Sequence, residues 1–194
     1  MRIIAGKHRG RRLTGPADLD IRPTSDRARE ALFNILSHGD YATPNGPLPQ
    51  DTAVLDVFAG TGALGFEALS RGAASVCFIE RNKAAARLIL ETAKAMGETA
   101  RVRVLTRDAT QPGHTKDGFH LVLLDAPYRT GQSEPSLNAL AKMGWLRDGG
   151  ICCIELAKQE DFRPGPSFTK LDERHYGAAR IVILRWDSPD EDNS

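Results

Sequence analysis

The stretch Asp56-Val57-Phe58-Ala59-Gly60-Thr61-Gly62-Ala63-Leu64-Gly65 decides the fold, because it carries an apolar strand through a glycine turn into a helix. The strand is expected over residues 54–58 and the helix from about 63 to 71. Glycine suits such a turn because a bound cofactor can approach the main chain more closely than a Cβ would permit. Gly60, Gly62 and Gly65 also match the GxGxxG spacing of dinucleotide sites, so the glycines alone leave the kind of cofactor open.

Strand and helix patterns alternate from this turn to the end of the chain. Six further strands are expected, over residues 76–80, 102–105, 120–124, 151–156, 168–175 and 180–186. Asn82 is suited to cap one helix and Gly97 to end it, and Pro135 is suited to start another. The last two strands flank Tyr176-Gly177 and indicate an antiparallel hairpin. We therefore predict an α/β protein with a doubly wound, seven-stranded Rossmann-like sheet.

The composition is that of a compact globular protein, since 41% of the 194 residues are hydrophobic and 26% are charged. We expect an N-terminal basic arm and helix over 1–40, the α/β domain over 51–187 and an acidic tail over 188–194. The apolar runs are too short to cross a bilayer and a signal-peptide pattern is missing, which favours a cytoplasmic protein. Cys77, Cys152 and Cys153 are expected to be reduced core residues, the last two on opposite faces of a strand. The histidines lack zinc spacing, so no metal is expected.

The first twelve residues are strongly basic, although the net charge of the chain is only +1. Such a segment favours a polyanionic partner, because lysine and arginine displace the counterions of phosphates. A solvated, fraying terminus explains the charges equally well. The arm could form a small hairpin, and its cations expected to face a partner are Lys7, Arg9, Arg11 and Arg12.

A helix is expected from Asp26 onward, with Thr24 or Ser25 as its N-cap. Its apolar side chains follow the spacing of one buried face: Ala28, Ala31, Leu32, Ile35 and Leu36. Three charged residues are expected away from that face: Arg27, Arg29 and Glu30.

Acidic residues distinguish between the two cofactors that the glycine turn allows. Asp56 lies in the first strand, where its carboxylate suits the cationic amino group of S-adenosylmethionine and would repel the pyrophosphate of NAD. Glu80 can hold ribose hydroxyls, and Asp108 can accept from the adenine amine, although an aspartate there is more often a turn residue. We expect S-adenosylmethionine in a pocket formed by Asp56, Phe58, Gly60, Gly62, Glu80, Arg81, Asp108 and Ala109.

The fourth strand runs directly into Asp125-Ala126-Pro127-Tyr128, at the carboxyl end where open α/β sheets bind ligands. This tetrapeptide suits methylation of an exocyclic amine on a base. The Asp125 carboxylate and the Ala126 carbonyl can accept the two N–H bonds and localise the nitrogen lone pair. Pro127 holds Ala126 extended, and Tyr128 can stack on an extruded base. An ordinary Asp-x-Pro turn is the simpler alternative.

At this point the chain resembles the bacterial 16S ribosomal RNA guanine-N2 methyltransferases of the class I, S-adenosylmethionine-dependent fold. The resemblance runs through residues 2–6, 9–11, 22–30, 56–65, 67–73 and 125–128, and the Arg22-Pro23-Thr24 block joined to the glycine turn is its most specific part. It implies that Asp125, Ala126 and Tyr128 hold a guanine and that Arg22 and the basic arm face RNA. The family usually has Asp-Pro-Pro-Phe or Asp-Pro-Pro-Tyr, so Ala126 is a departure. We expect activity to persist with a less preorganised pocket.

Several alternatives share parts of this pattern. A NAD-dependent oxidoreductase accounts for the glycines, an adenine-N6 nucleic-acid methyltransferase for the tetrapeptide, and a non-catalytic RNA-binding protein for the arm. Only a methyltransferase explains the glycine turn, the acids and the tetrapeptide together. We expect 16S rRNA or the small ribosomal subunit as the partner, and a monomer.

Overall fold

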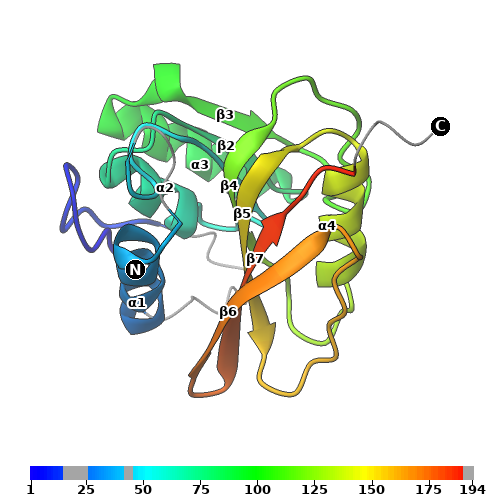
Figure 1. Cartoon of the computed structure of the whole chain (residues 1–194). Coiled ribbons are helices and arrows are strands. Elements are labelled where there is room, and N and C mark those ends of the chain that lie inside the picture. Colours follow the sequence, from blue (N-terminus) through cyan, green and yellow to red (C-terminus); the bar gives the residue numbers. More distant parts are fainter. Residues whose placement is uncertain (15–25, 42–45, 190–194) are drawn as a thin grey trace.

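The computed structural model of the chain describes residues 1–14, 26–41 and 46–189. Its centre is a seven-stranded sheet with the strand order β3-β2-β1-β4-β5-β7-β6 (Figure 1). The strands are β1 (Ala53–Val57), β2 (Ser75–Ile79), β3 (Val102–Leu105), β4 (Phe119–Asp125), β5 (Leu146–Ala157), β6 (Phe168–Tyr176) and β7 (Ala179–Trp186). β7 is antiparallel to both of its neighbours, whereas the other strand pairs are parallel. The predicted sheet and its closing hairpin are confirmed.

Helices cover both faces of this sheet (Figure 1). They are α1 (Asp26–His38), α2 (Ala63–Ser70), α3 (Lys83–Met96) and α4 (Ser133–Lys142), with a short 3-10 helix over Thr99–Arg101. Side chains of β4 alternate between two cores. Leu121 and Leu123 join the core beneath α1, α2 and α3, whereas Val122 and Leu124 join the core beneath α4. A strand that is apolar at successive positions is thereby buried on both sides, as a central parallel strand should be.

The cysteines follow the same alternation. Cys152 and Cys153 lie in different cores, and Cys77 is buried too. All three are free thiols, as expected. Burial raises the pKa of Cys152 to about 12, so its thiol stays protonated at neutral pH.

Local sequence signals predict most helix and strand ends to within two residues of their observed positions. The Asn82 side chain accepts from Ala84 N at 2.9 Å and from Ala85 N at 3.0 Å, and Gly97 ends α3 with a left-handed φ of 71°. α4 begins two residues before Pro135, which is tolerated within a first turn. β5 begins five residues before the predicted start, because Leu146 pairs with Phe119 ahead of an irregularity.

The N-terminal arm, residues 1–14, forms the expected hairpin. Ile3 N donates to Arg11 O at 2.9 Å, and Gly10 N donates to Ile3 O at 2.8 Å. Ile3 and Leu13 are buried in the core beneath α1 and α2. Burial of these two apolar side chains therefore holds the arm on the domain, so the arm is not a fraying terminus.

The expectation that Arg29 lies away from the buried face of α1 is wrong. Arg29 is fully buried and its Nε lies 3.8 Å from Oε2 of the equally buried Glu67 on α2. Its Nη2 donates to Arg2 O at 2.6 Å and to Asp26 Oδ1 at 2.8 Å. The buried stripe of α1 thus runs through Ala28, Arg29, Leu32, Phe33 and Leu36, with Ala31 and Ile35 only partly buried. A charge can lie there because α2 and the arm supply its partners.

The proposed caps Thr24 and Ser25, and also Arg22, lie outside the described residues. Within the ranges that are described, no helix has the length and apolar character needed to cross a membrane.

Candidate functional site

Three carboxylates from different strands meet at the carboxyl edge of the sheet. Asp56 lies in β1, Glu80 directly follows β2, and Asp125 ends β4. Burial raises the pKa of Asp56 well above its usual range, against the opposing effect of the Gly65 N–H, and the negative charges of Asp125 and Glu80 raise it further. The strand order therefore brings together three of the side chains that the sequence indicated. Their combined charge favours a cationic ligand.

The glycine turn is held by two of these carboxylates. Gly60 N donates to Glu80 Oε2 at 2.8 Å, and Gly65 N donates to Asp56 Oδ2 at 2.8 Å. The turn winds tightly, with left-handed φ values of 61° at Phe58, 55° at Gly60 and 75° at Gly62. A bulky residue with such a φ is an outlier, and backbone outliers of this kind cluster at ligand sites.

Packing gives Gly62 and Gly65 a second reason to be glycine, which sequence reasoning missed. A Cβ at Gly65 would lie 2.4 Å from Phe78 Cε1, and one at Gly62 would lie 2.8 Å from Phe66 Cε2. The two rings belong to β2 and α2 and pack against each other, with centroids 5.0 Å apart. These glycines therefore let α2 approach the sheet, whatever ligand lies above the turn.

The third strand brings Asp108 near Arg81, whose positive charge contributes to lowering the pKa of that aspartate. Hydrogen bonds from the hydroxyl and the N–H of Thr110 are the larger causes. Asp108 Oδ1 accepts these two hydrogen bonds at 2.7 and 2.8 Å, so it does form the local turn that was its alternative role. Its side chain is exposed, whereas the neighbouring Ala109 is buried in the core beneath α4. A contact between Asp108 and an adenine amine stays a prediction.

The tetrapeptide follows β4 directly, as expected. Ala126 is buried, Pro127 is exposed, and Tyr128 is partly buried. Tyr128 Oη donates to Oε1 of Glu155 at 2.7 Å. Glu155 lies near the end of β5 and is the register partner of Asp125 in the parallel pair. Sequence reasoning missed Glu155; the available signal was an acid within the otherwise apolar predicted strand 151–156.

The basic arm divides into cations with a partner in the fold and cations without one. Lys7 Nζ lies 2.8 Å and His8 Nε2 lies 2.7 Å from Oε1 of the buried Glu98. Burial opposes the ionisation of Glu98, but the hydrogen bonds from Lys7 and His8 outweigh it and leave its pKa below the ordinary value. Arg11 donates to Ala95 O.

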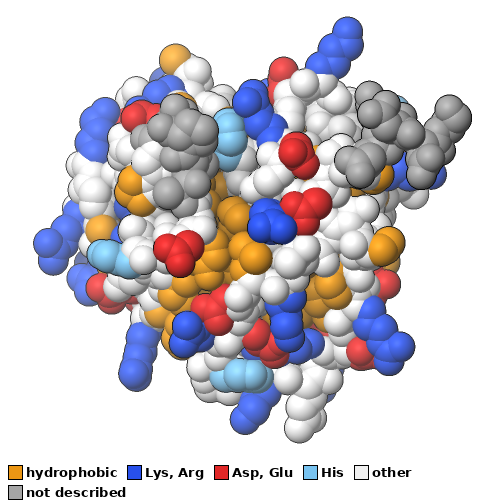
Figure 2. All heavy atoms as spheres, viewed as in Figure 1, with side chains coloured by type: hydrophobic (Ala, Val, Ile, Leu, Met, Phe, Trp, Pro, Cys, Tyr) orange, Lys and Arg blue, Asp and Glu red, His pale blue; other side chains and the backbone are white. Residues whose placement is uncertain are grey.

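Arg9 and Arg12 are exposed, and no described residue gives their side chains a hydrogen bond or an ion pair. On the face that Figure 2 shows, lysine and arginine side chains are scattered instead of forming one patch. In the described part of the chain, no three His, Cys, Asp or Glu side chains gather as metal ligands would.

Known proteins share this architecture over most of their length. Residues 1–185 match the family model described as conserved hypothetical protein 95. The ribosomal RNA small subunit methyltransferase D of Escherichia coli is 38% identical over 156 residues, which cover 80% of this chain and 74% of that protein. The protein of the same name from Haemophilus influenzae is 34% identical over 181 residues, covering 91% and 89%.

The solved structure of the Escherichia coli protein yhhF superposes with a TM-score of 0.82 at 32% identity, covering 97% of this chain and 99% of that one. The seven-stranded order with its antiparallel end is that of the class I methyltransferases. The chain belongs to the conserved hypothetical protein 95 family, together with ribosomal RNA small subunit methyltransferase D.

Proposed function

We propose that the protein transfers a methyl group from S-adenosylmethionine to the N2 amine of a guanine in 16S ribosomal RNA. The observation that carries this proposal is the meeting of Asp125 with Asp56 and Glu80 at one edge of the sheet. At this edge, the end of β4, where the tetrapeptide begins, lies beside the glycine turn that follows β1. The chain is also related to rRNA methyltransferases.

Asp125 and Ala126 act on the amine. An exocyclic amine on a base is a poor nucleophile, because its lone pair is delocalised into the ring. The Asp125 carboxylate and the Ala126 carbonyl accept its two N–H bonds and hold the nitrogen with its lone pair localised. Tyr128 stacks on the base and so replaces the neighbouring bases with which the nucleotide stacked before it was extruded. Most of the acceleration then comes from orientation.

The cofactor pocket uses the carboxylates and the glycine turn. When bound, S-adenosylmethionine supplies an electrophilic methyl group on a positively charged sulfonium. Asp56 faces its amino group, and Glu80 holds its ribose hydroxyls. Phe58, Gly60 and Gly62 would bring the main chain close to it, and Arg81, Asp108 and Ala109 would complete the pocket, with Asp108 accepting from the adenine amine. The pocket fits such a ligand because burial raises the pKa of Asp56, and the nearby carboxylates of Asp125 and Glu80 raise it further, so a cation beside them would favour the charged form.

Asp56→Asn should weaken S-adenosylmethionine binding roughly 10- to 100-fold, the effect of losing a charge-assisted hydrogen bond. In the apo-protein, Asp56→Asn should become more stable relative to the wild type as the pH rises from 4 to 8. An acid with a raised folded-state pKa stabilises the fold most below its unfolded pKa, about 4, and this stability is lost as the pH rises through the folded pKa. Asparagine avoids that loss and still accepts from Gly65 N. Calorimetric titration and melting curves at several pH values measure both effects; unchanged affinity would contradict the role of Asp56.

Glu155 is proposed as a positioning residue that orients Tyr128. Glu155→Ala should lower kcat about tenfold with unchanged S-adenosylmethionine affinity, because the ring loses the bond that fixes its angle. Glu155→Gln retains an acceptor and should recover most of the rate. Tyr128→Phe should match Glu155→Ala, and the double variant should be no slower than either one. Additive losses would mean that Glu155 acts independently of Tyr128.

The substrate is RNA in the cytoplasm, and a single chain suffices for the reaction. Arg9 and Arg12 are the arm cations open to phosphates, and Arg22 is proposed to join them. Lys7 and Arg11 contribute charge from their docked positions. We also propose that the protein acts as a monomer.

The decisive experiment is transfer of tritium from labelled S-adenosylmethionine to unmethylated 16S rRNA and to small ribosomal subunits, followed by nucleoside analysis. N2-methylguanosine is the expected product. N6-methyladenosine would overturn the choice of base, and the absence of transfer to either substrate would overturn the proposal.

A further inference from the structure

A groove of about 630 Å³ lies beside the tetrapeptide and takes no part in the chemistry described above. It is lined by residues from the turn after β4, the end of β5 and the turn between β6 and β7: Arg129, Ala157, Lys158, Gln159, Glu160 and Ala178. Its volume lies within the range of small-ligand sites. Arg129 directly follows Tyr128, so the groove begins where the target base is expected to stack.

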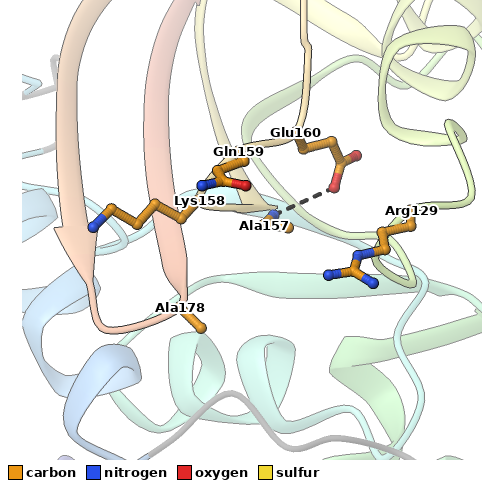
Figure 3. Close-up of a pocket in the computed structure, with 6 residues that line it drawn as sticks. All are labelled: Arg129, Ala157, Lys158, Gln159, Glu160 and Ala178. Carbon is orange, nitrogen blue, oxygen red and sulfur yellow. Dashed lines mark hydrogen bonds between the residues drawn. The ribbon is translucent and has the colours of Figure 1, made fainter.

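Arg129 is the cation aimed into this groove. Its guanidinium points toward the space between Ala157 and Ala178 (Figure 3). The side chain is exposed, and no described residue gives it a hydrogen bond or an ion pair. Lys158 extends from the other side of the lining, away from Arg129. Arg129 is therefore the cation that the groove presents to a ligand.

The backbone holds Arg129 in this place at a conformational cost. Its φ of 61° is left-handed, where a side chain with a Cβ is strained. Thr130 Oγ1 donates to Pro127 O at 2.7 Å and closes the turn around it. On the far side, Lys158 N donates to Ala178 O at 2.9 Å and joins the β5 end to the hairpin turn. The lining is thus fixed by bonds on both sides.

We propose that this groove binds the nucleotide adjacent to the target guanine, with Arg129 on its phosphate. The inference rests on the proposed function and identifies a substrate-recognition site for it. Phosphates flank an extruded base on both sides, and a guanidinium is suited to bind one with paired N–H donors. Ala157 and Ala178 offer apolar surface to a sugar or base, while Gln159 and Glu160 offer polar groups to its edge. The Glu160 carboxylate also accepts a hydrogen bond from Ala157 N at 3.3 Å, so part of its negative charge is compensated within the protein.

The test compares Arg129→Ala with Arg87→Ala. Arg87 is an exposed α3 cation paired with Glu91, so its variant removes the same charge away from the groove. Arg129→Ala should raise KM for RNA at least fivefold, with kcat within twofold and unchanged S-adenosylmethionine affinity. The slope of log(kcat/KM) against log salt should become shallower by about 0.7, as expected for one phosphate contact on a single strand. Arg87→Ala should behave like the wild type.

A second variant and a binding measurement distinguish failure of the groove assignment from failure of the proposed function. Arg129→Gly relieves the left-handed strain, so it should be at least as stable as Arg129→Ala and equally poor at RNA binding. Filter binding of the RNA in the presence of S-adenosylhomocysteine measures the contact without turnover. A wild type that binds RNA without methylating it would overturn the proposed function alone. A wild-type KM and RNA affinity in Arg129→Ala would overturn the groove assignment alone.

Discussion

Asp125→Ala should reduce methyl transfer by about 10³-fold, while the protein stays folded and binds S-adenosylmethionine. The size follows from the cost of removing one preorganised group that holds the reacting centre, about 10²- to 10³-fold, together with the lost alignment of the amine. Folding should survive because Asp125 is only partly buried and lies at the last position of β4. Single-turnover transfer of tritium to rRNA measures the chemical step directly.

Asp125→Asn separates the two properties of this carboxylate. Asparagine keeps an acceptor oxygen and loses the charge, so a rate between those of the wild type and Asp125→Ala is expected. Ala126→Pro is the matched backbone control: it restores the usual family tetrapeptide, keeps the carbonyl, and should retain activity. If Asp125→Ala transferred methyl groups at the wild-type rate, the RNA-binding alternative would explain the chain better. A folded but inactive Ala126→Pro variant would refute the role given to this loop.

The arrangement of the sheet was predictable because each strand carries its own signal. Continuous apolar runs such as Leu121 to Leu124 indicate strands buried on both faces, and the alternation of strands and helices then orders them. The carboxyl ends of parallel strands share one edge, so the meeting of Asp56 with Asp125 follows from that order. β5 was placed too late because Gly149-Gly150 marked a strand start, whereas the pair lies inside a strand that is irregular there.

The missed features all depend on pairs that are distant in the chain. Helical periodicity gives Arg29 a polar position, and only the approach of α2 reveals that Glu67 makes its burial possible. Glu155 likewise acquires its role from a tyrosine 27 residues away. The glycines show the complementary error: Gly62 was explained by a ligand, although a Cβ there would also lie 2.8 Å from Phe66 Cε2. A sequence records residue types, and their partners emerge only when the elements pack.

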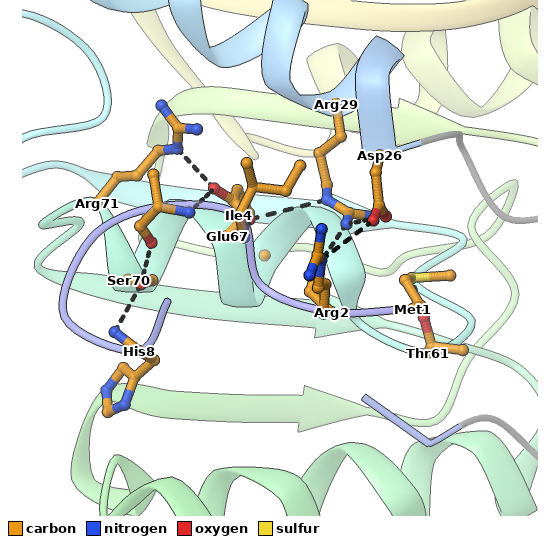
Figure 4. Close-up of polar contacts among 12 residues, drawn as sticks. Met1, Arg2, Ile4, His8, Asp26, Arg29, Thr61, Glu67, Ser70 and Arg71 are labelled. Atoms are coloured by element: carbon orange, nitrogen blue, oxygen red, sulfur yellow. Dashed lines mark hydrogen bonds and ion pairs between the residues drawn. The ribbon is translucent and has the colours of Figure 1, made fainter. Parts of the chain in front are cut away.

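Glu67→Ala should be the most destabilising single substitution considered for this chain. Glu67 is fully buried, and its carboxylate accepts from Ile4 N at 2.8 Å, Ala5 N at 3.1 Å and Arg71 Nε at 2.7 Å. Arg29 is its second cationic partner and is fully buried, so the carboxylate joins the arm, α1 and α2 (Figure 4). Removing one partner of a buried pair costs about 3–5 kcal/mol, because the other charge is left buried without compensation. For a chain of this size the melting temperature should fall by roughly 6–20 °C.

The arm should also detach, because the Ile4 and Ala5 amides lose their shared acceptor. Hydrogen exchange should therefore become faster in residues 1–14 than in the sheet, and RNA affinity should fall because Arg9 and Arg12 are no longer held on the domain. Glu67→Gln retains acceptor atoms and should lose less stability. Combining Glu67→Ala with Arg29→Met removes the orphaned guanidinium, so the double variant should be more stable than Glu67→Ala alone. A double variant in which the two losses simply add would show that the buried cation and the carboxylate are not coupled, and that Glu67 acts through Arg71 and the arm amides.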